Sequence, residues 1–266
     1  MTTPMHQTPR PSTNLNSELE ALLKTTRLCQ APRSITELTT TMELGRAFHD
    51  IFKSYRALYE KAGIRGDIRL YNLRYWRRDG STRGALLDLD DLDEKPRPFP
   101  MSAREQRPYM AYMALELLDR IDAGRPLPVH HDIYRIDLES LFYIVLAVSC
   151  HYCNGKQIKT EEWPFLRTAD LRMEKSNFLF RGVIPAPTPN FPGFKGLNQS
   201  LRALFREGFI AQADAREEGP GMSNFDRKTL GGVVTFDTFE AILDRHLALW
   251  TGVPLSDNSR QEHLEP

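Results

Sequence analysis

Three polar residues are spaced as the working groups of a phosphoryl-transfer site would be. Asn72 follows Asp67 by five positions, and a short hydrophobic run then ends at Asp88. In phosphoryl transfer, one carboxylate accepts the proton of the attacking hydroxyl, while an amide and a second carboxylate hold the metal ion on the phosphates. The spacing therefore indicates a base at Asp67 and metal ligands at Asn72 and Asp88. Asp and Asn also favour turns and helix caps, which is the purely structural alternative.

A long helix and a hairpin are expected to position these residues. Apolar residues recur at steps of three and four from 43 to 62, which predicts an amphipathic helix that Gly63 ends. A short strand is expected at 73–76, a turn at Asp79-Gly80 and a returning strand at 84–89. Because a hairpin brings the outer ends of its two strands together, this pattern predicts that Asn72 and Asp88 lie near each other.

The remaining chain reads as mostly helical. Four prolines between 94 and 108 indicate a loop. A capping-box pattern, Ser17 with Glu20, begins a short helix near the N-terminus. Further helices are expected at 110–121, 134–152, 169–178, 197–213 and 235–250.

Composition gives the chain no overall electrostatic preference for a partner. Its 266 residues contain 35 basic and 35 acidic side chains, so any charged function must be local. The longest apolar run, 141–150, is about half of the roughly 20 residues that span a bilayer. The N-terminal residues lack the hydrophobic stretch of a signal peptide. We therefore expect no membrane association and an intracellular location, in the cytoplasm or the nucleus.

The expected hairpin also carries a cluster of arginines and aromatic residues. Such a cluster could serve as a nucleic-acid surface, because guanidinium groups contact phosphates and aromatic rings stack on bases. A solvated hairpin beside phosphate chemistry explains the cluster equally well, and we favour that interpretation. The cluster consists of Arg69, Tyr71, Arg74, Tyr75, Trp76, Arg77 and Arg78.

Several runs of the sequence, taken in order, resemble the fungal-type protein kinases. The resemblance covers about residues 34 to 247. It is carried by Leu58-Tyr59-Glu60-Lys61-Ala62-Gly63-Ile64, Gly66-Asp67-Ile68, Asn72-Leu73, Leu87-Asp88-Leu89-Asp90, Tyr112-Met113-Ala114-Leu115-Glu116-Leu117-Leu118, Tyr134-Arg135-Ile136-Asp137-Leu138-Glu139-Ser140-Leu141-Phe142-Tyr143 and Thr229-Leu230-Gly231-Gly232.

The resemblance implies a fold and a role for individual residues. The fold would be mainly α (α+β), a protein-kinase-like C-terminal lobe with a small β-hairpin. Asp67 would be the catalytic base, Arg69 a cation that balances charge on the transferring phosphate, and Asn72 and Asp88 the ligands of Mg²⁺ in the Mg²⁺–ATP cofactor. Asp137 would hydrogen-bond the backbone of the catalytic loop.

The sequence also departs from the family pattern. The run Ile64-Arg65-Gly66 contains no His before the catalytic Asp, and Gly66 stands where many kinases carry an Arg. The 42 residues before the long helix contain no Gly-rich loop and no strand carrying a Lys, so the N-terminal lobe is expected to be absent or degenerate. Two functions stay open. One is transfer of the ATP γ-phosphate to Ser or Thr hydroxyls of a protein substrate; the other is an inactive pseudokinase that binds or regulates a partner, or a truncated gene product.

These interpretations divide the chain into four parts. Residues 1–16 are expected to form a disordered tail and residues 17–33 a short helix and linker. Residues 34–250 form the kinase-like lobe, and residues 251–266 a polar tail.

Overall fold

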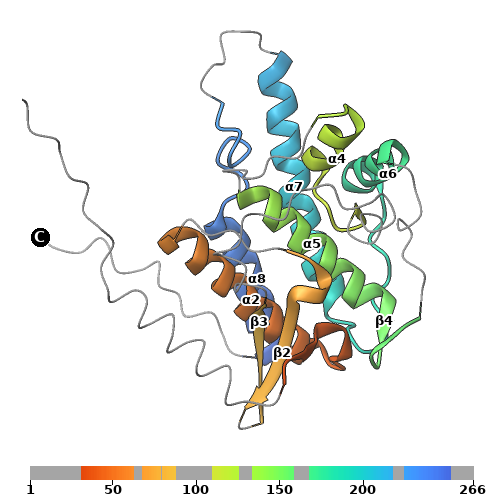
Figure 1. Ribbon diagram of the computed structural model, residues 1–266, viewed down its shortest axis with the longest axis vertical. Coiled ribbons are helices and arrows are strands. Elements are labelled where there is room, and N and C mark those ends of the chain that lie inside the picture. The colour runs from red at the N-terminus through yellow and green to blue at the C-terminus, as the bar shows by residue number, and fades with distance from the viewer. Residues whose placement is uncertain are drawn as a thin grey trace, which may run out of the picture.

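The computed structural model describes residues 31–62, 68–78, 80–87, 110–125, 134–158, 168–217 and 225–252. These residues form a mainly helical fold with a small antiparallel sheet (Figure 1), which confirms the predicted fold class. The elements are β1 (Arg33–Ser34), η1 (Ile35–Glu37), α2 (Thr41–Ala62), η2 (Leu70–Asn72), β2 (Leu73–Arg78), β3 (Ser81–Leu86), α4 (Leu115–Asp122), α5 (Tyr134–His151), β4 (Tyr152–Cys153), β5 (Lys156–Gln157), α6 (Thr168–Arg181), α7 (Phe194–Glu217) and α8 (Phe236–Thr251).

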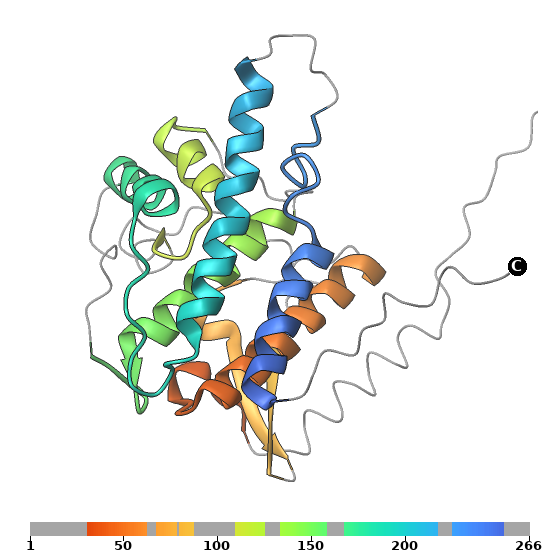
Figure 2. The same cartoon turned by 180° about the vertical axis from the view of Figure 1, so that it is seen from behind.

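Helix α2 confirms the predicted long amphipathic helix. Before its first turn, the Thr40 hydroxyl accepts a hydrogen bond from the backbone N–H of Glu43 at 3.2 Å, a local interaction that helps the helix begin. Its apolar face includes Phe48 and Phe52, which are almost fully buried. The ring of Phe52 stacks on Phe239 of α8 with centroids 5.2 Å apart. Figure 2 shows α2 and α8 side by side.

The predicted hairpin is present as strands β2 and β3. Leu73 pairs with Leu86 and Arg78 with Ser81, while β1 adds a short third strand on the other side of β2. Gly80 has φ of 71°, the left-handed conformation that a tight turn requires. Strand β3 lies directly against α2. A side chain at Gly84 would place its Cβ 1.9 Å from the carbonyl oxygen of Ala47, so only glycine permits this approach.

Helix α5 forms the centre of the core. Every residue from Arg135 to His151 is buried, as expected of a helix that is apolar on all sides. The Phe142 ring stacks on Phe205 of α7 with centroids 5.7 Å apart. Figures 1 and 2 show α5 crossing the middle of the molecule, with other helices on both sides. Helix α5 is therefore enclosed by the rest of the core.

The structure differs from the sequence prediction in several local features. Helix α4 begins at Leu115, whereas the periodicity predicted a start at Met110. A second hairpin, β4 and β5, follows α5 directly, and its turn residues Asn154 and Gly155 both have positive φ. Neither that hairpin nor β1 was predicted.

Some predictions cannot be compared with the structure. The predicted tail 1–16, almost all of the segment 17–33, the helix end at Gly63 and nearly all of the tail 251–266 lie outside the described residues. Within the described part of the chain, no helix is both long and apolar enough to cross a bilayer.

Candidate phosphoryl-transfer site

The chain leading into the hairpin carries two of the predicted site residues. Asp67 itself lies outside the described residues. After it, Ile68 is buried, and the backbone N–H of Asn72 donates to the carbonyl of Arg69 at 2.9 Å. This bond closes the single turn η2. The Arg69 guanidinium donates to the Tyr71 hydroxyl at 2.9 Å and lies 5.8 Å from the centroid of its ring, so the ring fixes the direction of this cation.

Asn72 joins the start of the hairpin to its end. The carbonyl oxygen of Asn72 accepts a hydrogen bond from the backbone N–H of Leu87 at 2.9 Å, and Asn72 is 2% exposed. Leu87 immediately precedes Asp88, which lies outside the described residues. The backbone therefore brings Asn72 to the residue next to Asp88. The relative positions of the Asp67 and Asp88 carboxylates stay a prediction.

Asp137 on α5 is buried and hydrogen-bonded. The Tyr55 hydroxyl of α2 donates to its Oδ2 at 2.6 Å. Both residues are largely excluded from water, with exposed fractions of 0% for Tyr55 and 7% for Asp137. A charge-assisted bond of this length ties α2, which precedes the candidate catalytic segment, to the central helix. Whether Asp137 also contacts the backbone of that segment stays a prediction.

Glu116 is paired with an arginine from the central helix. Arg135 is fully buried, and its Nη2 donates to Glu116 Oε2 at 2.7 Å and to the carbonyl oxygen of Arg227 at 3.3 Å. One guanidinium thus joins α4, α5 and the turn before α8. Sequence reasoning missed the role of Arg135, although a charge on a largely apolar helix was a signal that a partner must lie nearby.

Two further buried charges hold α4 in place. The Glu139 carboxylate accepts hydrogen bonds from the backbone N–H of Leu115 and from the Tyr143 hydroxyl, each at 3.0 Å. Burial raises the pKa of Glu139, while the Leu115 N–H and the charges of Arg135 and Lys175 oppose that rise.

Lys175 reaches the segment before α4 from helix α6. Its Nζ donates to the carbonyl oxygen of Met113 at 2.6 Å and lies 3.9 Å from the centroid of the Tyr143 ring. Sequence reasoning missed both Glu139 and Lys175 as anchors of α4. The signal for Glu139 was a carboxylate on an apolar helix, and no sequence signal indicated the partner of Lys175.

Arginines of the hairpin take part in contacts within the protein. Arg77 pairs with Glu43 of α2 at 2.5 Å, and both Arg77 and Arg33 lie within 6 Å of the Tyr75 ring centroid. These contacts anchor the hairpin to its neighbours. Whether the cluster also contacts nucleic acid stays a prediction.

One cluster contains residue types that bind metal ions, but its carboxylates are paired with side chains of the protein. Possible ligand atoms of His49, Glu240 and Asp244 lie within 4.8 Å of one another. However, Arg56 pairs with Glu240 at 2.6 Å, and the ring of His49 hydrogen-bonds Asp244 at 2.8 Å. The carboxylates already have protein partners, so we interpret the cluster as an ion-pair network between α2 and α8.

The helical core with its small hairpin is the architecture of a protein-kinase C-terminal lobe. Comparison with known families supports that class, because the model of the family described as fungal protein kinase matches residues 17–149. The chain belongs to the fungal protein kinase family. The searches of curated proteins and of solved structures each gave no match.

Proposed function

We propose that this chain carries the phosphoryl-transfer half of a protein kinase site and transfers the γ-phosphate of Mg²⁺–ATP to Ser or Thr hydroxyls. In this proposal Asp67 accepts the hydroxyl proton, Asn72 and Asp88 bind Mg²⁺, and Arg69 balances charge on the transferring phosphate. When bound, the metal would neutralise the phosphate oxygens. The role of the protein is to hold the residues that bind the metal at the ends of one hairpin.

The observation that carries the proposal is the hydrogen bond between Leu87 N–H and the Asn72 carbonyl. Two residues that are distant in the sequence become neighbours through this bond, and the second of them directly precedes Asp88. Amide and carboxylate oxygens are ligands that Mg²⁺ accepts. Membership of the fungal protein kinase family supports the same assignment.

Binding is tested by thermal unfolding with and without Mg²⁺–ATP. Ligand at about 100 times its dissociation constant adds about 2.7 kcal/mol to the free energy of unfolding. At about 2 to 4 °C per kcal/mol for a domain of this size, the unfolding temperature should rise by roughly 5 to 10 °C. Asp88→Asn should abolish the rise, because it removes a metal-binding charge without a large change in shape. An equal rise in parent and variant would refute the assignment of Asp88.

Chemistry is tested separately by transfer of radiolabel from γ-labelled ATP to a mixture of protein substrates. Asp67→Asn should retain the thermal shift and lose transfer, because the amide cannot accept the hydroxyl proton. Equal transfer by parent and Asp67→Asn would exclude this residue as the base.

A second candidate function is a binding or regulatory module that retains the fold without transferring phosphate. The observation that favours it is the run Ile64-Arg65-Gly66, which contains no His and has Gly66 where many kinases carry an Arg. A parent protein that shows the thermal shift without transfer, or neither effect, would support this second function.

A further inference from the structure

A cavity lined by arginines lies between α4, α6 and α7. Figure 1 shows α4 and α6 away from the β2–β3 hairpin. Its volume is about 420 Å³, within the range of small-ligand pockets. Five arginines line it, on α4, α6 and α7, on the segment after α4 and on the turn before α8, together with two carboxylates, Glu116 and Asp119. The whole chain has equal numbers of acidic and basic residues, so this excess of positive charge is a local feature.

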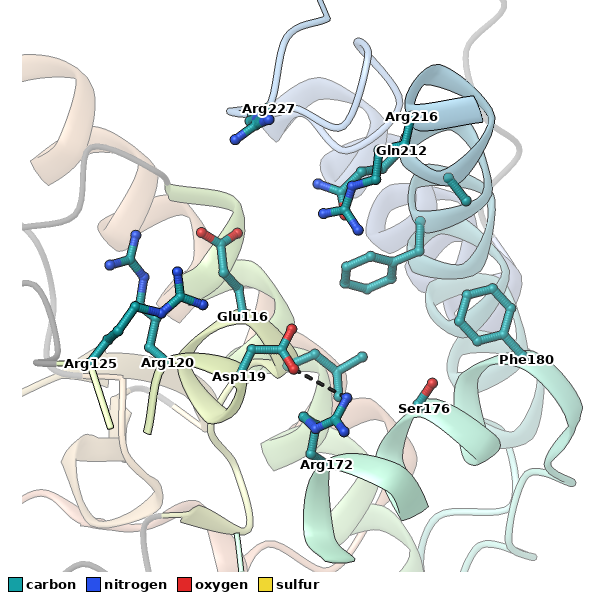
Figure 3. A pocket seen from close by; sticks show the side chains of 13 residues that line it. Glu116, Asp119, Arg120, Arg125, Arg172, Ser176, Phe180, Gln212, Arg216 and Arg227 are labelled. Atoms are coloured by element: carbon teal, nitrogen blue, oxygen red, sulfur yellow. Dashed lines mark ion pairs between the residues drawn. The ribbon is translucent and has the colours of Figure 1, made fainter. Parts of the chain in front are cut away.

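Both carboxylates of the lining already have cationic partners. Glu116 pairs with the buried Arg135 behind the cavity wall at 2.7 Å. Asp119 pairs with Arg172 at 3.4 Å, the dashed contact of Figure 3. The acids of the lining are therefore used in holding α4 against α5 and α6.

Four lining arginines are left without such partners. Within the described part of the chain, the guanidinium groups of Arg120, Arg125, Arg216 and Arg227 make no hydrogen bond or ion pair. Figure 3 shows Arg120 and Arg125 on the α4 side and Arg216 extending from α7 opposite them, with Arg227 at a third edge. Like charges gathered around one cavity repel one another, and a bound anion would relieve that repulsion.

The chemistry of the wall indicates which anion fits. Guanidinium groups bind phosphate with paired hydrogen bonds, and a phosphate monoester carries close to two negative charges near neutral pH. A single carboxylate would offset only one of the four cations. Phe180, which is 38% exposed, and Phe209 add an apolar surface on the α6 and α7 side. An apolar group beside the phosphate would be covered by these rings.

We propose that this cavity binds a phosphate monoester that carries an adjacent apolar group. Two sources share this chemistry: a phosphorylated side chain of a protein segment, and a small phosphate ester. The inference goes beyond the proposed function, since the cavity is separate from the Asn72 hairpin. Its test needs neither Mg²⁺ nor ATP.

The first measurement is binding by the full chain in buffer with EDTA, at constant ionic strength and without nucleotide. The probes are phenyl phosphate and a labelled peptide, Gly-Phe-pSer-Phe-Gly, with its unphosphorylated form as a control. Both phosphorylated probes should bind saturably, and the unphosphorylated peptide should not. Equal binding of the two peptides would overturn the proposal, as would absence of saturation by both phosphorylated probes up to about 10 mM.

The second measurement compares two charge-matched double variants. Arg216→Ala with Arg227→Ala removes two exposed cations of the lining, so the fold should be retained. Arg46→Ala with Arg245→Ala removes two exposed cations of α2 and α8 outside it. The lining variant should raise the dissociation constant at least about tenfold, equivalent to about 1.4 kcal/mol, and the control less than about twofold. Equal losses would overturn the proposal, because binding would then follow total charge.

The relative affinity of the two probes identifies the source of the ligand. A peptide that binds at least about tenfold more tightly than phenyl phosphate assigns the cavity to a phosphorylated protein segment. Equal affinity assigns it to a small ester. Both results support a phosphate monoester as the ligand.

Discussion

Replacing Tyr55 by Phe tests the buried link between α2 and the central helix. The substitution removes one hydroxyl and keeps the ring. That hydroxyl donates to Asp137 at 2.6 Å, and neither residue is more than 7% exposed. A hydrogen bond to a charged group contributes about 1.5 to 3 kcal/mol net, and burial shields this one from competing water. At about 2 to 4 °C per kcal/mol, the unfolding temperature should fall by roughly 3 to 12 °C.

The control is the same chemical change at a buried ring whose hydroxyl lacks this interaction. Tyr75 is 1% exposed, and its hydroxyl makes no hydrogen bond within the described residues. Tyr75→Phe should change the free energy of unfolding by less than about 0.5 kcal/mol. Urea unfolding followed by circular dichroism gives both values under identical conditions. Losses that agree within about 0.5 kcal/mol would refute the argument, because the bond to Asp137 would then add nothing measurable.

A double-mutant cycle assigns the effect to the pair. Asp137→Asn keeps the size of the side chain and removes its charge, so the bond from Tyr55 loses its ionic part. The two substitutions contact each other, and their coupling energy should be about 1 to 2 kcal/mol. Additive losses would show that Tyr55 acts through ring packing alone.

Three further predictions follow from packing and from titration. Gly84→Ala should lower the free energy of unfolding by at least about 2 kcal/mol, because the new Cβ would meet the Ala47 carbonyl at 1.9 Å. Gly80→Ala, whose new Cβ would meet no other atom, should cost only about 1 kcal/mol. Equal losses in urea unfolding would contradict this difference. Burial raises the pKa of Glu139 above 4.5. The stabilisation that this carboxyl group contributes is therefore full below pH 4.5, and it is lost as the pH rises through the folded-state pKa. The stability of the parent relative to Glu139→Gln should therefore fall as pH rises, and a constant difference would refute it. Burial lowers the pKa of His246 below 6.5, so the parent should lose stability relative to His246→Gln as pH falls from about 7.5 to 5.5. The measurement is the unfolding temperature of the parent minus that of the variant, which should decrease over this range. An increase on acidification would refute the argument.

The long elements could be predicted because their signals are repeated along the chain. Helix α2 repeats its apolar residues over 22 positions, so no single residue decides the prediction. The β2–β3 hairpin followed from Asp79-Gly80 between two strand-like runs. A similar signal, Asn154-Gly155, was missed at the β4–β5 turn. Its strands have only two residues each, too few to show an alternating pattern beside the end of a helix.

The start of α4 could not be predicted, because a distant residue decides it. Periodicity predicts a helix from Met110, but the carbonyl of Met113 accepts a bond from Lys175 on α6 at 2.6 Å. The N–H of Met113 instead closes a short turn on Met110, and helix α4 begins at Leu115. A contact between residues 62 positions apart cannot be read from the local pattern of apolar residues. The prediction was wrong because tertiary contacts determine this helix start, and local propensity does not.

The sequence predicted the hairpin that positions Asn72, but it did not predict the partners of the buried charges on α5. The hairpin register brings Asn72 to Leu87, while the predicted approach of Asn72 to Asp88 stays a prediction, because Asp88 lies outside the described residues. Arg135 and Glu139 were read only as part of a family pattern. Both are charges on a helix whose hydrophobic surroundings make an unpaired charge expensive, so the sequence required partners for them. Apart from Tyr143, which lies on α5 itself, it could not name those partners, since they lie on α4 and on the turn before α8.

Three polar side chains of α5 connect this helix to its neighbours α2 and α4. Asp137 binds Tyr55 of α2, Arg135 binds Glu116 of α4, and Glu139 binds the backbone N–H of Leu115 at the start of α4. Each hydrogen bond to a charged group contributes about 1.5 to 3 kcal/mol net, and removing one partner leaves the other buried without its bond. Small displacements of α2 or α4 are therefore opposed by bonds to one rigid helix. It follows that α5 fixes the distance between the helix that leads into the candidate catalytic segment and the helix that carries Glu116.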